Sequence, residues 1–230
     1  MPIEPQREEN QMLTLSLQKP DAAPVRRLKL SLNKGARFSV QVEWDCKADH
    51  QDDVDVHALE AVNSGHGAKV GALEGILSTY NTTRMSRTGA LKTNPDGSFA
   101  TPSGGLSHSG DIRVQGSKAE VLTVDGSKVP PAVNEIPIFA TVHKADHGEG
   151  HEEEHDDDDE AAFSDIDRCV VTISDESGRV LGKYQLSDEF GEFNVVQLGT
   201  VMLAPNGGWE YVPVGVGFKG DFNDVLGHFC

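Results

Sequence analysis

The stretch RFSVQVEW, residues 37–44, alternates strictly between polar and apolar side chains. Its even-numbered residues are apolar and end in Trp44, whereas its odd-numbered residues are polar. Because successive side chains of an extended chain point to opposite sides, this pattern predicts a half-buried antiparallel strand. We expect Trp44 to lie in the hydrophobic core, since it ends the apolar face.

Short segments of this kind recur along the chain with turn signals between them, and helical periodicity is scarce. About ten short strands joined by turns predict an all-β fold, an antiparallel β-sandwich, and not an α/β fold. Residues 175–178 (DESG) predict a hairpin loop. We also expect a helical turn near residues 127–133 and a short C-terminal helix over residues 221–229. The other strand candidates are 12–17, 28–32, 54–62, 75–80, 121–124, 135–143, 168–174, 180–186, 195–203 and 209–216.

The 230 residues suffice for one large β domain or two small ones. We predict one sandwich domain over residues 28–229, preceded by a flexible polar arm over residues 1–27. Residues 84–107 are rich in Gly, Ser, Thr and Pro, and we expect a long exposed loop or hairpin insertion there. Residues 146–160 carry ten carboxylates. Because such a block repels itself and cannot be buried, we expect a solvated, disordered loop.

The charge and the cysteines narrow the class of protein. A formal net charge of -17 argues against nucleic-acid binding and against electrostatic attraction to anionic lipid. No stretch resembles a signal peptide or approaches the roughly 20 apolar residues of a membrane span. The cysteines are widely spaced and form no CxxC pair, which favours reduced thiols. We therefore expect a cytoplasmic protein without direct membrane insertion.

Two aspartates at the start of a predicted strand form the strongest candidate site. Asp53 and Asp55 are two residues apart, so their carboxylates point to the same side of an extended chain and can converge on one cation. Far downstream, Asp111 lies in the Gly-containing turn HSGD. Asp45 and Asp52 are outer candidates. The alternative is that these aspartates cap turns by accepting backbone N–H hydrogen bonds.

A second candidate is the histidine-rich acidic block. Four histidines repeat every four residues from His143 to His155, and on a helix they would share one face and could chelate zinc, nickel or copper. Gly148 and Gly150 interrupt the segment, however, and its charge opposes helix formation. The interpretation is a disordered loop with weak metal affinity, and the alternative is a transition-metal buffer or sensor.

The sequence contains no convincing catalytic motif. Ser109 stands beside His108, but sequence neighbours do not make a triad, and neither a nucleophile elbow nor a phosphate loop is present. Cys169 lies in an apolar run and is expected to be buried. An Asp pair could hold a metal for hydrolysis, yet no positioned base accompanies it. We predict that the protein is not an enzyme.

The ordered motifs together resemble the TerD family of tellurium-resistance and stress-response proteins, over residues 28–229. The resemblance implies a calcium-binding β-sandwich of bacterial stress operons, linked to resistance to tellurite, phage or colicins, with no established enzymatic activity. It also implies partners among other TerD-like proteins and membrane-associated stress-complex components. The motifs are LSLNKG (30–35), VEWD (42–45), DVDVHA (53–58), YN (80–81), HSGD (108–111), VDGSKVP (124–130), FSDIDRCVVTISDESGRVLGKYQLSD (163–188) and GGWEYVPVGVGF (207–218).

The chain departs from the family pattern near the implied ion site. Members usually carry an acidic segment ending Asp-Asp-Glu, and here those positions are Lys118, Ala119 and Glu120. Calcium takes six to eight oxygen ligands, so an ammonium and a methyl group there weaken a second site. The resemblance therefore implies one Ca²⁺ site. Its ligands would be Asp53, Asp55, Asp111 and Glu120.

The sequence thus predicts a non-enzymatic TerD-like stress-response protein. Its cation would neutralise mutually repelling carboxylates and order the loops at one end of the sandwich as a partner-binding surface. Two alternatives stay open: an accessory protein of a phage or plasmid that has lost calcium binding, and a transition-metal buffer acting through the His-rich acidic loop.

Overall fold

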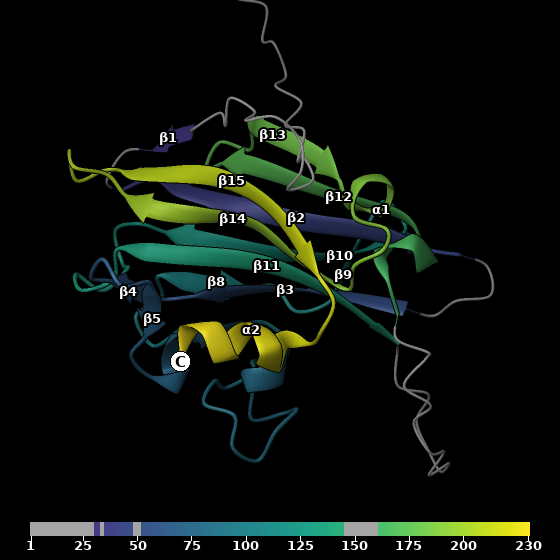
Figure 1. Cartoon of the computed structure of the whole chain (residues 1–230), viewed down its shortest axis with the longest axis horizontal. Helices are drawn as coiled ribbons and strands as arrows, with labels where there is room; N and C mark the ends of the chain where they lie inside the picture. The colour runs from purple at the N-terminus through teal and green to yellow at the C-terminus, as the bar shows by residue number, and fades with distance from the viewer. Residues whose placement is uncertain (1–29, 33–34, 48–51, 145–160) are drawn as a thin grey trace, which may run out of the picture.

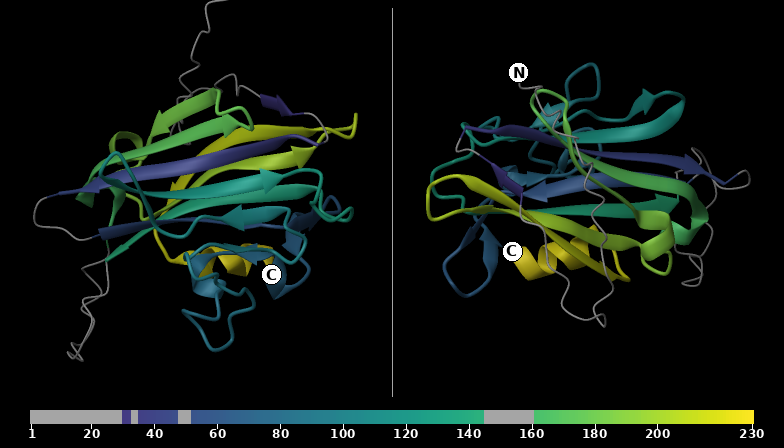
Figure 2. Two further views of the ribbon diagram at one scale, coloured as in Figure 1. Left: turned by 180° about the vertical axis from the view of Figure 1, so that it is seen from behind. Right: turned by 90° about the horizontal axis from the view of Figure 1, so that it is seen from above.

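The computed structural model describes residues 30–32, 35–47, 52–144 and 161–230. Two antiparallel sheets pack face to face, with a C-terminal helix against one of them (Figure 1). The view from behind and the view from above show the same two layers (Figure 2). The predicted antiparallel β-sandwich is confirmed.

The first sheet holds both the C-terminal strands and β3, which carries the candidate aspartates. The short strands β4 (Ala61–Asn63) and β5 (Ala68–Val70) extend it, because β4 pairs with both β11 and β5. In spatial order its strands are β1 (Leu30–Leu32), β15 (Trp209–Phe218), β14 (Val195–Leu203), β11 (Glu135–Lys144), β3 (Asp52–Leu59) and β6 (Ile76–Leu77).

The second sheet is centred on β2 and β10. In spatial order its strands are β13 (Val180–Gln185), β12 (Ile166–Asp175), β2 (Arg37–Cys46), β10 (Ser117–Asp125), β8 (Leu106–His108) and β7 (Phe99–Ala100), and β9 (Ile112–Val114) also pairs with β10. The helical elements are the short 3-10 helices η1 (Leu73–Gly75), η2 (Thr79–Asn81) and η3 (Phe163–Asp165), together with α1 (Leu186–Glu189) and α2 (Phe222–Phe229).

The core lies between the inner faces of the two sheets. Strand β2 supplies its even-numbered residues to this core, and Trp44 is only 1% exposed, as its place at the end of the apolar face predicts. From the other sheet, Val54 and Val56 of β3 face the same core. The period of two in both strands therefore sets which side chains remain for the outer surface and the cleft.

Helix α2 closes a second, smaller core on the outer face of the first sheet. Its buried residues Phe222 and Val225 pack with Leu59 and Phe139 from β3 and β11. Asp221 caps the helix by accepting a hydrogen bond from the backbone N–H of Asp224, whose side chain in turn accepts one from the Asp221 N–H. The predicted C-terminal helix is confirmed, and its cap explains where it begins.

Several local predictions need correction. The expected helical turn near 127–133 is a series of turns, and α1 was not expected. The strand expected over 54–62 ends at Leu59, while the one expected over 75–80 is limited to Ile76–Leu77 and is followed by η2. At the first place the strand is interrupted only at Glu60 and resumes as β4, which pairs with β11 as β3 does.

The segment 84–107 is less exposed than expected. Leu91, Phe99 and Leu106 are buried in the main core, and the segment contains β7 and the first residues of β8, which pair as a hairpin. Its many Gly, Ser and Pro residues mark turns between short sheet pieces. The arm over residues 1–27, the strand expected over 12–17 and the acidic block over 146–160 all lie outside the described residues.

The cysteines form no disulfide among the described residues. Cys169 is fully buried, as its apolar surroundings predict; burial raises the pKa of this thiol. Among the residues that the structure describes, no helix is both long enough and apolar enough to cross a membrane.

Candidate functional site

Strand β3 separates apolar from polar side chains at its N-terminal end. Val54 and Val56 point into the core between the sheets. Asp53, Asp55 and His57 point to the other face, because neighbouring residues of a strand alternate. The DVDVH sequence thus places both aspartates on the same polar side of β3.

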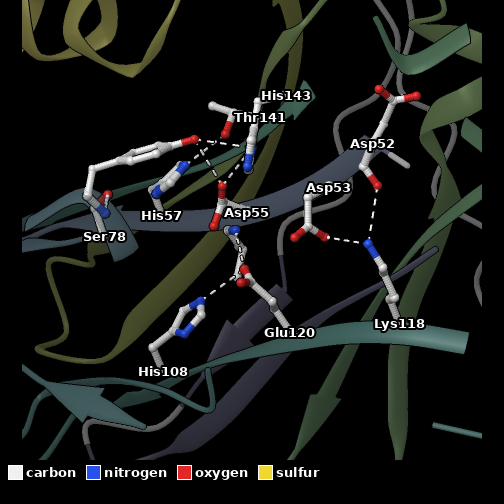
Figure 3. A network of polar contacts seen from close by, with 12 residues as sticks. Asp52, Asp53, Asp55, His57, Ser78, His108, Lys118, Glu120, Thr141 and His143 are labelled. Carbon is white, nitrogen blue, oxygen red and sulfur yellow. Dashed lines mark hydrogen bonds and ion pairs between the residues drawn. The ribbon is translucent and has the colours of Figure 1, made fainter. Parts of the chain in front are cut away.

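An open cleft of ≈ 330 Å³ lies beside this polar side of β3. All four carboxylates expected at the ion site line it, although they come from β3, from the turn before β9 and from β10. Figure 3 shows three of them together with their polar partners. The opposite wall is formed by residues 79–99. The four carboxylates are Asp53, Asp55, Asp111 and Glu120.

Glu120 joins the two sheets at the base of the cleft. It is 1% exposed, and its Oε2 accepts a hydrogen bond of 2.7 Å from the backbone N–H of Val56. Nε2 of His108 lies 3.1 Å from the same oxygen. Since Nδ1 of His108 accepts from the N–H of Gly110, the proton of the neutral ring is on Nε2 and is donated to Glu120.

These surroundings favour the protonated form of Glu120. Burial raises its pKa well above the ordinary range, and the negative charges of Asp55 and Asp111 raise it further, whereas the Val56 N–H acts in the opposite sense. Burial also lowers the pKa of His108 to about 4, so the imidazole beside Glu120 is neutral. A carboxyl group whose protonated form is favoured and a neutral imidazole therefore occupy the floor of the cleft.

Asp55 is an ionised carboxylate of the cleft. Its Oδ2 accepts a hydrogen bond of 3.1 Å from the Tyr80 hydroxyl and lies 3.1 Å from Nδ1 of His143. Burial raises the pKa of Asp55, but the His143 hydrogen bond, the positive potential of His57 and His143, and the Tyr80 hydrogen bond together lower it to about 2. The charge of Asp55 in turn favours the neutral form of Glu120.

Asp53 has a cationic partner. Nζ of Lys118 lies 3.2 Å from its Oδ1, on the side away from Asp55 (Figure 3). Burial raises the pKa of Asp53, Lys118 lowers it, and the charges of Asp55 and Asp111 raise it, so that the net shift is upward. The cleft thus brings several carboxylates together, with the Lys118 ammonium beside Asp53 and Arg84 among its lining residues as nearby cationic groups.

Asp111 lies at the exposed rim of the cleft. The preceding residue, Gly110, has φ 66°, and a side chain there would collide with the backbone of Gly97. Only glycine satisfies both conditions, so the HSGD turn lies directly against the loop around Gly97. This close approach sets Asp111 over Glu120, to which its side chain is hydrogen-bonded.

The donor chemistry of the cleft fits a hard cation. It offers carboxylate oxygens together with the hydroxyls of Thr79 and Thr93, which are buried and have no partner among the described residues. Calcium binds such oxygen ligands. No group of three or more acidic, histidine or cysteine side chains in the described ranges is already arranged around one point, however. A cation would have to displace part of the present network.

The other sequence candidates lie elsewhere or act differently. Asp45 pairs with Arg168 at 2.9 Å, outside the cleft. Asp52 is 3% exposed, and its backbone carbonyl faces Lys118. The side chains of Asp53 and Asp55 contact other side chains, which differs from the turn-capping alternative.

Three side chains that contact Asp55 or Glu120 were not among the sequence candidates for the ion site: Tyr80, His108 and His143. His143 lies on β11 directly across from Asp53, and Thr141 lies across from Asp55. Pairing of β3 with β11 was the signal that could have located His143 beside the aspartates. Of the four regularly spaced histidines, His143 is the one within the described residues, and it belongs to this cleft.

The chain is similar in sequence and in fold to known proteins. The family model described as the TerD domain matches residues 96–229, which is more than half of the chain. The chain belongs to the TerD family. The matched part includes Asp111, Glu120 and α2, whereas β3 precedes it.

One curated relative of this TerD family member is the uncharacterized protein YceE of Bacillus subtilis (strain 168). The two are 27% identical over 122 residues, which cover 52% of this chain and 57% of YceE. The chain thus matches little more than half the length of that relative.

Solved structures share the fold. A homologue of the telluride resistance protein TerD from Streptomyces coelicolor A3(2) superposes with a TM-score of 0.56 at 17% identity, over 85% of this chain and 95% of that one. SAV2460, a protein of unknown function, gives a TM-score of 0.56 at 15% identity, over 83% and 94% of the two chains. At these identities the likeness extends to the fold alone.

Proposed function

We propose that this TerD family member is a non-enzymatic stress-response protein whose acidic cleft binds Ca²⁺. The observation that supports the proposal is that Asp53, Asp55, Asp111 and Glu120, which come from three separate parts of the chain, line one cleft of ≈ 330 Å³. Within a family linked to resistance against tellurite and related stresses, a site of this chemistry suits a hard divalent cation.

The residues that would hold the ion are Asp53, Asp55, Asp111 and Glu120. A bound cation supplies positive charge that offsets the mutual repulsion of these groups. Glu120 would give up its proton on binding, because carboxylates ligate in the ionised form. The Val56 N–H and the His108 Nε2–H already point at its Oε2 and would stabilise the resulting charge.

Binding would also order the loops around the cleft. The HSGD turn contributes Asp111, and residues 79–99 form the facing wall. When a cation holds the carboxylates, these two segments form one continuous surface. We propose that this surface contacts other TerD-like proteins and membrane-associated components of a stress complex. The net charge of -17 disfavours nucleic acid as a partner.

A non-catalytic role is supported by the chemistry of the site. Its buried acid, Glu120, is hydrogen-bonded to a backbone N–H and to a neutral imidazole. The cleft aligns no Ser, Thr or Cys nucleophile with a base in the way that covalent catalysis requires, as far as the described residues extend.

Calorimetric titration of the full chain with CaCl₂ tests the proposal. We expect saturable heat and a rise in melting temperature, both lost in Asp55→Asn. The matched control is Glu176→Gln, which removes one exposed charge. Glu176 follows Asp175, which pairs with Phe38 at the end of the second sheet far from the cleft. Because both variants retain the acidic residues 146–160, their difference isolates the cleft.

Two outcomes would contradict the proposed calcium site. If the wild-type chain gives neither heat nor a rise in melting temperature at millimolar Ca²⁺, calcium binding is wrong. If Asp55→Asn binds as well as Glu176→Gln, the ion is bound elsewhere and the cleft assignment is wrong.

A further inference from the structure

Lys118 brings a positive charge to the acidic cleft from the sheet opposite β3. Its Nζ donates to Oδ1 of Asp53 at 3.2 Å and to the backbone carbonyl oxygen of Asp52 at 3.4 Å. The Lys118 and Asp53 side chains are 31% and 29% exposed, so water reaches the pair only in part. In Figure 3 the ammonium approaches Asp53 from the side opposite Asp55.

The backbone fixes Lys118 in this place. Strand β10 pairs with β2 so that Lys118 lies directly across from Trp44. The ammonium is 6.0 Å from the centroid of the Trp44 ring, a distance at which the ring attracts a cation. Because Trp44 is 1% exposed and held in the core, it is a rigid neighbour for the lysine.

Asp53 lies between two cavities, and its ion-pair partner Lys118 lines only one of them. It lines the acidic cleft with Asp55 and Glu120, and it also lines a neighbouring cavity of ≈ 300 Å³ that Lys118 shares. An ammonium group offers three donors and one full charge. Lys118 thus supplies to Asp53 what an external cation would otherwise supply.

We propose that Lys118 is a tethered internal cation that occupies the Asp53 side of the cleft and competes there with the external divalent ion. The inference rests on the proposed calcium binding. It makes Asp53 available to the external ion only when the Lys118 contact is broken, so that Asp55, Asp111 and Glu120 are the ligands otherwise left, and it makes Lys118 a residue that limits how strongly the cleft binds a dication.

The charge balance gives the direction of the effect. A dication at the carboxylates of the cleft is repelled by the nearby ammonium, and it can gain Asp53 only if the Lys118 contact is broken. Removal of this charge over a few ångströms is expected to strengthen calcium binding roughly tenfold or more. It also frees both oxygens of Asp53 as ligands.

The test compares Lys118→Met with Lys128→Met by calorimetric titration of the full chain with CaCl₂. Both substitutions remove one lysine charge and keep a long unbranched side chain. Lys128 is a matched control because it also forms an ion pair, with Asp125 at 3.2 Å, but at the opposite end of β10. Thermal unfolding in chelator verifies that each variant is folded, and Lys118→Gln serves as a second variant.

We expect Lys118→Met to bind Ca²⁺ at least about tenfold more tightly than the wild type, and Lys128→Met to match the wild type. Equal affinity and stoichiometry in Lys118→Met and the wild type would overturn this inference while leaving calcium binding intact. If the wild type is silent but Lys118→Met binds, Lys118 blocks the cleft completely, which supports the internal cation while calcium binding by the wild-type chain is wrong. If neither binds, both the inference and the proposed calcium binding are wrong.

Discussion

Glu120 of one sheet accepts a hydrogen bond of 2.7 Å from the backbone N–H of Val56 in the other. Among the described residues, β6 pairs only with the last two residues of β3, so the edge of β3 near Val56 has no strand beside it. A buried N–H without a partner is costly. Glu120 therefore completes the hydrogen bonding of β3 and at the same time forms the base of the acidic cleft.

This double role predicts a difference between two substitutions of Glu120. Glu120→Gln keeps an oxygen that can accept from Val56 and resembles the protonated acid, so the free energy of unfolding in chelator should change by less than about 1 kcal/mol. Glu120→Leu leaves the Val56 N–H unpaired and should lower that free energy by about 1–3 kcal/mol. Denaturant unfolding at pH 7 measures both. A large loss in Glu120→Gln would mean that Glu120 is ionised in the folded protein.

Buried histidines predict loss of stability in mild acid. Burial lowers the pKa of His57 and of His108 to about 4, whereas an unfolded chain titrates histidine near 6.5. Between those values the unfolded chain binds protons that the folded chain does not, so stability falls as the pH is lowered from about 6.5 to about 4. Each histidine contributes up to about 1.4 kcal/mol per pH unit.

Glu120 acts in the opposite direction over the same window. Its pKa is raised on folding, so the folded chain holds a proton that the unfolded chain has released above its ordinary pKa. Denaturant unfolding between pH 4 and 7, in chelator, should therefore show a reduced slope in His57→Gln and a steeper slope in Glu120→Gln. Identical slopes in the wild type and both variants would contradict the assignment of these protonation states.

Helix α2 is expected to keep water away from His57 and so to hold the pKa of its imidazole low. The Phe222 ring stacks on the His57 ring with centroids 4.0 Å apart, and Phe222 is 5% exposed. Phe222→Ala should cost about 3 kcal/mol in the free energy of unfolding. It should also raise the pKa of His57 from about 4 toward its ordinary value, because water then reaches the imidazole. NMR titration of the histidine ring protons measures this shift.

A control at the other end of the helix separates burial from simple destabilisation. Phe229 contacts Phe139, at a ring-centroid distance of 5.7 Å, and not His57. Phe229→Ala should therefore leave the His57 titration unchanged. If both variants shift it equally, helix docking as a whole, and not the Phe222 ring, keeps His57 neutral.

The sequence predicts the framework of the fold better than the chemistry of its cleft. The alternation in β2 and the DVDVH segment of β3 determine which side chains face the core, since a strand alternates by its geometry. These patterns locate Trp44 in the core and put Asp53 and Asp55 on one side. Both conclusions depend only on neighbours in the chain.

The polar partners in the cleft depend on contacts between strands that are distant in sequence. The contact of Lys118 with Asp53 and that of Glu120 with Val56 arise from the packing of β10 against β3 across the two sheets. His143 reaches Asp55 only through the register between β11 and β3. No pattern within a single segment carries this information, which explains why these residues were absent or incompletely understood in the sequence predictions.

Close packing between β14 and β15 predicts opposite effects of the same substitution at two glycines. A methyl group at Gly199 would overlap the ring of Tyr211, which is fully buried and cannot move away easily, so Gly199→Ala should lower the free energy of unfolding by about 1–3 kcal/mol. Gly227 lies in α2 with nothing within 4 Å of the added methyl, so Gly227→Ala should raise it by about 0.5–1 kcal/mol through helix propensity. Denaturant unfolding of both variants checks the pair. Equal effects at the two positions would mean that the β14–β15 contact is looser than the Gly199–Tyr211 packing implies.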